Sequence, residues 1–265
     1  MASTLWSYEH PTWHENASAI IKRHSTNQHD VRQEALAGLD LSEVRDVLEL
    51  GCGFGFMAEE VARRVNAGAR VVGVDACTAN EDTFVARVAA TGRQATFVNA
   101  VIDATLPFVS ESFDLVVASY SLYFFPGILG EVCRVMRDGA LLLAVTHSEN
   151  CCHDLMAAAG FGGESPLLRL VRRFSAENGM DKLSPWFADV DVVQYPNSLR
   201  FENGEVEDLL TYLRFKLPLA FSVSDSGPEL PAFVEPTLRA AMERQNVLIV
   251  HKDDAIFRCR RPTCR

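Results

Sequence analysis

Residues 46–55 read Asp-Val-Leu-Glu-Leu-Gly-Cys-Gly-Phe-Gly, a short apolar run that ends in three alternate glycines. Apolar residues at helical spacing follow at Met57, Val61, Ala62 and Val65. The pattern therefore predicts a strand, a glycine turn and a helix. Because such a turn lets backbone amides and a helix N-terminus approach a ligand closely, it is the first candidate for a binding site.

The alternation of strands and helices continues downstream. We expect strands at 70–75, 95–99, 113–119 and 140–146, and helices at 79–90 and 129–136. These strands are apolar on both faces, as in Leu141-Leu142-Leu143, and that pattern is typical of a parallel sheet covered by helices on both sides. The sequence therefore predicts a doubly wound, Rossmann-like α/β fold.

The pattern changes after His147. We expect a basic amphipathic helix at 165–178, an extended piece at 189–195, helices at 205–216 and 235–245, and β-rich pieces at 247–251 and 255–259. This predicts three parts: an N-terminal helical arm or lid (1–40), a ligand-binding core (41–150) and a C-terminal part (151–265). The last would hold a helical cap at about 161–245 and closing strands at about 247–260. The arm contains Trp6, Tyr8 and Trp13, more aromatic residues than a free chain end usually has, and this suggests that the arm packs against another surface.

Composition excludes several classes of function. The 265 residues include 25 basic and 35 acidic side chains, a net charge of −10 that repels polyphosphate and argues against a nucleic-acid partner. Apolar runs such as Ala140–Val145 are far shorter than the roughly 18 residues of a membrane span, and residues 1–10 show no signal pattern. We therefore expect a cytoplasmic protein without a membrane partner.

The seven cysteines are odd in number and form no CxxC pair. Reduced thiols are the expected state, because the adjacent Cys151 and Cys152 are too close for an easy disulfide with each other. Together with His153 they lack the second pair of ligands that a zinc site needs, so no metal site is expected.

The glycine spacing narrows the choice of cofactor. A dinucleotide fingerprint would place its third glycine where this chain has Phe56, which disfavours an NAD-dependent oxidoreductase and leaves it as an alternative. Glu49 stands two residues before Gly51 and brings a carboxylate near the turn. A carboxylate repels phosphate and attracts an ammonium or sulfonium group.

Two further carboxylates follow strands. Asp75 closes the second expected strand, where it can accept both hydroxyls of a ribose, and helix capping is the alternative role. Asp103 follows the third expected strand, where a carboxylate can hold the exocyclic amine of a purine, and a turn role is the alternative.

Together these blocks resemble the class I S-adenosylmethionine-dependent methyltransferases of small-molecule type. The resemblance covers about residues 45–146 and rests on 47–55, Val74-Asp75, Asp103-Ala104 before Leu106-Pro107-Phe108, and 112–116. It implies a mostly parallel seven-stranded sheet, S-adenosylmethionine as the cofactor, S-adenosylhomocysteine as the product, and methyl transfer to oxygen, nitrogen or carbon of a small organic acceptor. The resemblance also implies which residues contact the cofactor. Gly51, Cys52 and Gly53 would line the methionine end with Glu49 beneath them, and Ser119 or Tyr120 would contact the methionyl part. Asp75 would bind the ribose, Ala76 and Cys77 the adenosine, and Asp103 and Ala104 the adenine.

The candidates for catalysis are His147, Tyr120 and His14. The methyl group of a sulfonium is already activated, so the protein needs mainly to align a nucleophile and, for some acceptors, to remove a proton. His147 follows the fifth expected strand and has the ordinary pKa of a general base at neutral pH, with a turn role as the alternative. His14 lies in the aromatic arm, which could close over the cofactor or simply pack on the core.

Two other readings stay open: the NAD-dependent oxidoreductase, and a protein of the same fold that binds the cofactor without transferring a methyl group. For either enzyme we expect a small-molecule substrate and a monomer or homodimer.

Overall fold

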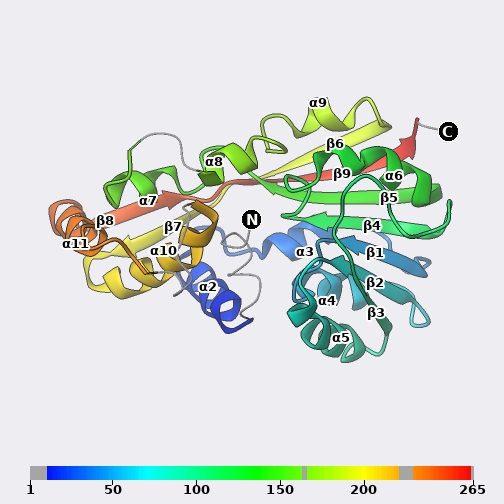
Figure 1. Ribbon diagram of the computed structural model, residues 1–265, viewed down its shortest axis with the longest axis horizontal. Coiled ribbons are helices and arrows are strands. Elements are labelled where there is room, and N and C mark those ends of the chain that lie inside the picture. Colours follow the sequence, from blue (N-terminus) through cyan, green and yellow to red (C-terminus); the bar gives the residue numbers. More distant parts are fainter. Residues whose placement is uncertain (1–10, 163–165, 221–228, 264–265) are drawn as a thin grey trace. The chain divides into compact units, whose positions relative to one another are not determined.

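The computed structural model describes residues 11–162, 166–220 and 229–263, so Trp6 and Tyr8 of the expected arm lie outside the described residues. The chain forms two compact units, each built from separate segments. The sheet unit comprises His29–Thr146, Arg172–Tyr195 and Ala255–Arg265, and the helical unit comprises Met1–Gln28, His147–Val171 and Pro196–Asp254. Figure 1 labels their helices and strands.

The sheet unit is built on a seven-stranded sheet with the strand order β3-β2-β1-β4-β5-β9-β6. β1 pairs in parallel with β2 and with β4, β2 with β3, and β4 with β5. This confirms the expected α/β fold with a mostly parallel sheet. The strands are β1 (Asp46–Leu50), β2 (Arg70–Asp75), β3 (Gln94–Asn99), β4 (Phe113–Ser119), β5 (Met136–His147), β6 (Phe187–Tyr195) and β9 (Asp254–Pro262).

Strand order reverses at β1, because β2 and β3 lie on one side of it and β4 and β5 on the other. In open α/β sheets ligands bind outside the carboxyl ends of the strands at such a switch point. The turn that follows β1 therefore starts at the position where this architecture favours a ligand.

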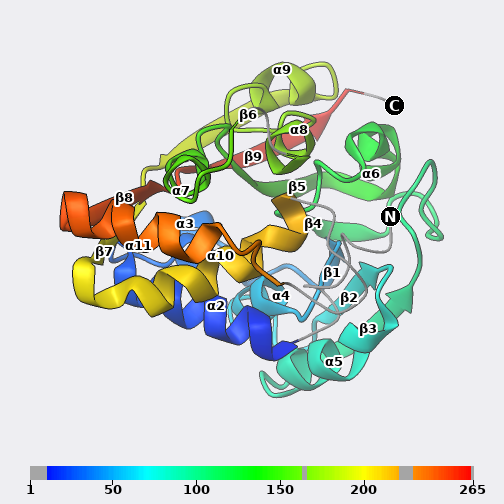
Figure 2. The same cartoon turned by 60° about the vertical axis from the view of Figure 1, so that its left-hand side comes forward.

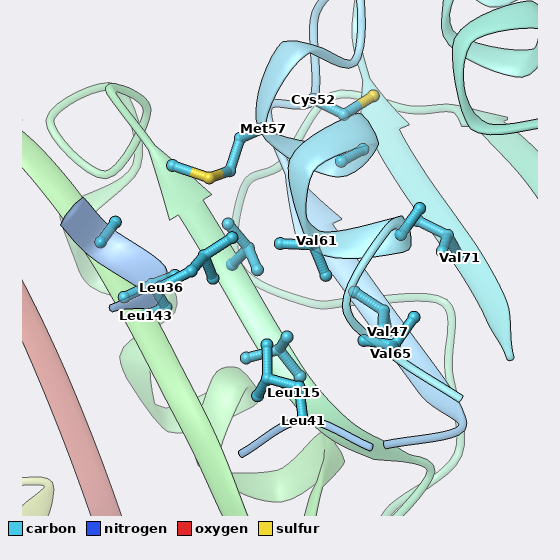
Figure 3. Close-up of a cluster of buried hydrophobic side chains, with 14 of the residues drawn as sticks. Leu36, Leu41, Val47, Cys52, Met57, Val61, Val65, Val71, Leu115 and Leu143 are labelled. Carbon is cyan, nitrogen blue, oxygen red and sulfur yellow. The ribbon is translucent and has the colours of Figure 1, made fainter. Parts of the chain in front are cut away.

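The helices of the sheet unit are α3 (Val31–Leu36), α4 (Phe56–Ala62), α5 (Glu81–Ala89), α6 (Leu129–Val135) and α9 (Gly179–Leu183), with short 3₁₀ turns η2 (Thr78–Asn80) and η3 (Pro126–Ile128). α4 and α5 contact each other and lie against β2 and β3 (Figure 1). α4 buries Met57, Ala58, Val61 and Ala62, which recur at helical spacing on one face. Figure 3 shows Val61 and Val65 among side chains of the neighbouring strands, including Val47 and Leu115.

The helical unit combines a small antiparallel sheet with helices. β7 (Ser198–Glu202) pairs with β8 (Val247–His251), and the helices are α2 (Pro11–His24), α7 (His153–Ala158), α8 (Pro166–Val171), α10 (Val206–Ala220) and α11 (Val234–Gln245), with the 3₁₀ turn η4 (Asn203–Glu205). α10 contacts α2, α8 and α11, and Figure 2 shows α2, α10 and α11 side by side. The fully buried Leu209, Tyr212 and Leu213 of α10 belong to the core of this unit.

The expected helix at 165–178 is wrong, because α8 ends at Val171. The backbone amide of Ser175 donates to Asn178 Oδ1 over 2.9 Å, and Asn178 Nδ2 donates to the carbonyl of Arg172 over 2.7 Å. Side chains of this kind compete with helical hydrogen bonds and favour a turn. Strand β7 has no counterpart in the sequence prediction, although its alternation of buried Leu199 and Phe201 with polar residues has the period of a half-buried strand.

Candidate functional site

The turn after β1 requires glycine for two separate reasons. Gly51 and Gly55 have φ of +67° and +80°, a left-handed conformation that disfavours other residues. A Cβ at Gly51 would lie 2.6 Å from Cβ of Ser121, whose hydroxyl donates to the carbonyl of Leu50 over 2.6 Å. The turn after β1 is thus packed directly on the segment that follows β4, with no room for a side chain between them.

Gly53 differs from its neighbours in the turn. It also has a positive φ of +48°, but a Cβ built there would meet no atom within 4 Å. Its backbone amide donates to Asp75 Oδ2 over 2.9 Å. The backbone at Gly53 therefore faces open space, which a ligand can use for close approach.

Glu49 is a buried acid beneath this turn. Glu49 is only 2% exposed, and its carboxyl group accepts a hydrogen bond from the backbone amide of Ala58 in α4. Its Oε2 atom is buried and has no hydrogen-bond partner. Burial, with a smaller contribution from the charge of Asp75, raises the pKa of Glu49 from 4.5 to about 8. The carboxyl is therefore mostly neutral at pH 7 and would ionise if a cation came close.

Asp75 holds the turn to the end of β2. Besides Gly53, its carboxylate accepts the backbone amide of Cys77 at 2.9 Å and, over a longer 3.4 Å, the side chain of Asn80. Burial raises the pKa of Asp75, and the hydrogen bonds from Cys77 and Gly53 oppose the shift. The carboxylate of Asp75 therefore accepts hydrogen bonds from residues just before and within η2. It also stands at the carboxyl end of β2, where the sequence predicts a contact with the ribose.

The remaining predicted cofactor residues follow the other parallel strands. Ser119 is the last residue of β4 and pairs with Val145 of β5. Tyr120 comes next, half-buried and with a positive φ of +54°, and its amide donates to the carbonyl of Val145 over 2.8 Å. Carboxyl ends of parallel strands meet at one edge of a sheet, so these residues gather on the edge that carries Glu49 and Asp75.

Beyond β2 and β3 the exposure of the predicted residues varies. Ala76, Asp103 and Ala104 are exposed, and Cys77 is buried. Exposed side chains at the edge of a site can contact a ligand without displacing core packing, whereas Cys77 would have to use its backbone.

The position that would hold the third glycine of a dinucleotide site is filled by a substantial side chain. Phe56 begins α4, and the guanidinium groups of Arg87 and Arg32 lie 4.2 and 5.7 Å from the centre of its ring. Phe56 is half-buried, and cation–π contacts of this kind stabilise the position of its ring. Residue 56 therefore does not allow the tight packing of helix on sheet that a third glycine would allow.

His147 and His14 both belong to the helical unit. His147 is buried, and its Nδ1 lies 2.7 Å from Oδ1 of Asp254, which also accepts a hydrogen bond from Lys252 over 2.8 Å. Burial lowers the pKa of His147 to about 4. Burial of Asp254 acts to raise its pKa, but the charge of Lys252 and the hydrogen bonds from His147 and Lys252 outweigh it and hold that pKa well below its usual range. The imidazole is therefore neutral at pH 7, and its Nδ1–H donates to the ionised Asp254.

The sequence did not point to Asp254, which lies 107 positions away from His147 along the chain, in a polar run with no distinctive spacing. His14 lies on α2, and its ring packs edge-on against Phe215 of α10 with the ring centres 4.8 Å apart. Among residues 11–162, 166–220 and 229–263 there is no group of three or more His, Cys, Asp or Glu placed to hold a metal ion. None of the helices described is long and apolar enough to cross a membrane.

Comparison with known proteins identifies the part of the chain that carries this site. Residues 47–139 match the family model described as a methyltransferase domain. This segment is therefore similar to a methyltransferase domain, in agreement with the resemblance of the sequence to the class I S-adenosylmethionine-dependent methyltransferases. The match covers the turn after β1, Asp75, Asp103 and the carboxyl end of β4, so the methyltransferase domain contains every predicted cofactor residue.

One curated relative is the nocamycin O-methyltransferase of Saccharothrix syringae, 34% identical over 102 residues. That alignment covers 37% of this chain and 36% of the relative, so the chain matches about a third of the relative's length. The likeness therefore leaves most of both proteins outside it.

Two solved structures share the fold over most of the chain. A candidate methyltransferase from Bacillus halodurans C-125 matches with a TM-score of 0.53 and 17% identity, over 88% of this chain and 98% of that one. The [4+2]-cyclase SpnF matches with a TM-score of 0.52 and 17% identity, over 87% of this chain and 79% of that one. At such identities the likeness concerns the fold alone.

Proposed function

We propose that the chain binds S-adenosylmethionine at the turn between β1 and α4 and transfers its methyl group to oxygen, nitrogen or carbon of a small organic acceptor. The observation that carries the proposal is the buried Glu49, whose Oε2 has no hydrogen-bond partner beneath a glycine turn open at Gly53. S-adenosylmethionine carries two positive groups, a sulfonium and an ammonium. A buried acid that ionises when a cation arrives suits such a ligand and opposes a pyrophosphate.

The other residues of the domain fit the same ligand. Gly51, Cys52 and Gly53 would line the methionine end with their backbone, Asp75 would accept the ribose hydroxyls, Ala76 and Cys77 would contact the adenosine, Asp103 and Ala104 the adenine, and Ser119 or Tyr120 the methionyl part. The fit is supported by the open space at Gly53 and by the position of Asp75 at the carboxyl end of β2. The bound cofactor supplies an electrophilic methyl group, so the chain needs to align the acceptor and exclude water.

Where the acceptor must lose a proton, we propose His147 as the general base. Ionised Asp254 holds the Nδ1–H of His147, so Nε2 is the nitrogen that carries no proton in this tautomer. The lowered pKa of His147 keeps the imidazole neutral across the neutral pH range, and it also makes the imidazole a weaker base than the ordinary histidine expected from the sequence. Tyr120 at the end of β4 and His14 on α2 are the other candidates for contact with the acceptor.

The first experiment is thermal unfolding of the full chain with S-adenosylmethionine, S-adenosylhomocysteine, NADH or no ligand. A ligand at 100 times its Kd adds about 2.7 kcal/mol, which raises the midpoint of a chain of this size by several degrees. We expect a shift with either sulfur ligand, and none with NADH. A shift with NADH alone would favour the oxidoreductase, and binding without turnover on any acceptor would favour a cofactor-binding protein.

Asp75→Ala should weaken the shift, and Asp114→Ala is its matched control. Asp114, at the amino end of β4, accepts the backbone amides of Arg45 and Asp46 at 2.9 Å, just as Asp75 accepts those of Gly53 and Cys77. Each variant loses two hydrogen bonds from backbone amides, and each also loses one side-chain partner, Asn80 in Asp75→Ala and Arg137 in Asp114→Ala, so both should unfold earlier without ligand. The ligand-induced shift should fall in Asp75→Ala and persist in Asp114→Ala. Equal shifts in the two variants would contradict a ligand contact at Asp75.

A further inference from the structure

The helical unit contains a buried cluster of charged and sulfur-bearing side chains outside the methyltransferase domain. We call it the thiol cluster. It consists of His147, Cys151, Cys152, Tyr212, Lys216, Lys252 and Asp254, and all of these residues are buried. Cores rarely hold this many ionisable groups, so the charges of the thiol cluster must be balanced internally.

Cys152 lies at the centre of two sulfur hydrogen bonds. Its Sγ is 3.5 Å from Sγ of Cys151 and 3.6 Å from the hydroxyl oxygen of Tyr212. Its backbone has a positive φ of +63° and is held by an amide that donates to the carbonyl of His251 over 2.9 Å. A thiolate at Cys152 can accept hydrogen bonds from both neighbours at once, because a deprotonated sulfur is purely an acceptor.

The charges of the cluster point the same way. Lys252 is paired with Asp254 at 2.8 Å, and that carboxylate also holds the neutral His147. Lys216 is only 4% exposed, and its ammonium lies 5.8 Å from the centre of the Tyr212 ring. No carboxylate of the described residues forms an ion pair with Lys216. The cluster thus holds two ammonium groups against one carboxylate, and a buried unpaired charge is expensive.

We propose that Cys152 is held as a thiolate by Lys216 and Lys252 and is the site at which small electrophiles and peroxides modify this chain. With one thiolate the thiol cluster has two positive and two negative charges and is neutral. The thiolate, rather than the thiol, is the form of cysteine that reacts with alkylating agents and peroxides.

The groups that act directly on Cys152 are Cys151, Tyr212 and Lys216 of α10, and Lys252 between β8 and β9. His147 and Asp254, the first residue of β9, are linked to these groups through Lys252. The nearby Asp154 and His251 are paired with each other. The hydrogen bond from Cys151 and the charge of Lys216 lower the pKa of Cys152 to about 6, while the pKa of Cys151 is raised.

Other buried cysteines of the chain lack this environment. Burial raises the pKa of Cys259 to about 12 and that of Cys52 well above its ordinary value. Both belong to the sheet unit and provide internal controls in the same sample.

The chemistry of the modification is balanced with a peroxide as the oxidant. The thiolate sulfur attacks one peroxide oxygen, the O–O bond breaks, and a sulfenic acid and hydroxide form, so that sulfur is oxidised and the peroxide reduced. With iodoacetamide an S–C bond forms and iodide leaves. Adjacent Cα atoms stand about 3.8 Å apart, closer than a disulfide normally allows, so we expect a sulfenic acid rather than a bond between Cys151 and Cys152.

The decisive measurement is thiolate absorbance at 240 nm during a pH titration of the folded full chain, because it requires no access of a reagent. We expect one thiolate with a midpoint well below the ordinary pKa of a cysteine, retained in Cys151→Ser with a higher midpoint and lost in Cys152→Ser. Lys216→Met keeps the length of the side chain, removes its charge and should raise the midpoint. Lys22→Met changes an exposed lysine of α2 and should not. Circular dichroism checks that each variant is folded.

Iodoacetamide labelling at neutral pH, followed by peptide mass spectrometry, provides the second readout. It is done in a Cys264→Ser background, because residue 264 lies outside the described residues. We expect Cys152 to react at least about tenfold faster than Cys52 and Cys259, in proportion to its thiolate fraction. Identical absorbance of the wild-type chain and Cys152→Ser above the midpoint would overturn the proposal, whatever the labelling shows.

Discussion

Replacing Glu49 by Gln tests the central feature of the cofactor site. Gln has the shape of a protonated glutamic acid and cannot ionise, so the substitution preserves the packing and removes only the titration. The pKa of Glu49 is raised from 4.5 to about 8 in the folded chain, where the side chain is 2% exposed. A folded pKa above the unfolded one means that Glu49 contributes full stability below pH about 4.5, and that this contribution is lost as pH rises toward about 8.

The size of the effect follows from linkage. Between the two pKa values the folded chain holds one proton more than the unfolded chain, which costs about 1.4 kcal/mol per pH unit. From pH 5 to pH 8 the wild-type chain should therefore lose on the order of 3 kcal/mol relative to Glu49→Gln, or roughly 6–12 °C in the unfolding midpoint. Asp114→Asn, at the other edge of the sheet, serves as a control for changes of charge that do not involve this site.

The assay is urea unfolding of both chains at several pH values, followed by the same measurement with S-adenosylmethionine. The stability curves of wild type and Glu49→Gln should converge near pH 5 and separate as pH rises. Parallel curves would refute the buried, neutral acid. With the cofactor bound, calorimetry in two buffers of different ionisation enthalpy should show proton release near pH 7 for the wild-type chain and less for Glu49→Gln. Equal release from the two chains would refute a role of Glu49 toward the cationic ligand.

Three further predictions follow. Gly51→Ala should lower the free energy of unfolding by about 2–5 kcal/mol, because it adds left-handed strain and overpacking. Gly53→Ala should lower it by only about 1–2 kcal/mol but should weaken cofactor binding. Equal losses of stability in urea unfolding would contradict the difference in packing. His147→Ala should keep the cofactor-induced thermal shift and lose turnover, and an unchanged kcat on the true acceptor would eliminate it as the base. Asp254→Asn leaves Lys252 buried without its carboxylate partner and should lower the free energy of unfolding by about 3–5 kcal/mol. Adding Lys252→Met should restore most of that stability. No recovery in the double variant would show that the loss has another cause.

Local sequence patterns determined the sheet unit of this protein. The strands at 46–50, 70–75 and 113–119 are apolar on both faces because a parallel sheet is covered on both sides, so short windows suffice to find them. The three alternate glycines mark the turn after β1 because only glycine adopts their backbone conformation without strain. The positions of Glu49 and Asp75 relative to that turn follow from chain spacing alone, since parallel strands bring their carboxyl ends to one edge.

Only the tertiary structure decided what surrounds those residues. Sequence spacing placed a carboxylate at Glu49, but its burial, its hydrogen bond from Ala58 and the proximity of Asp75 depend on the packing of α4 and β2. Local patterns also could not predict that His147 meets Asp254, or that the charge of Lys216 acts on Cys152, because each pair joins segments far apart in the chain. Hydrogen bonds, desolvation and charge act through space, so protonation states and reactive groups are properties of the folded chain, whereas strands and turns are largely properties of neighbouring residues.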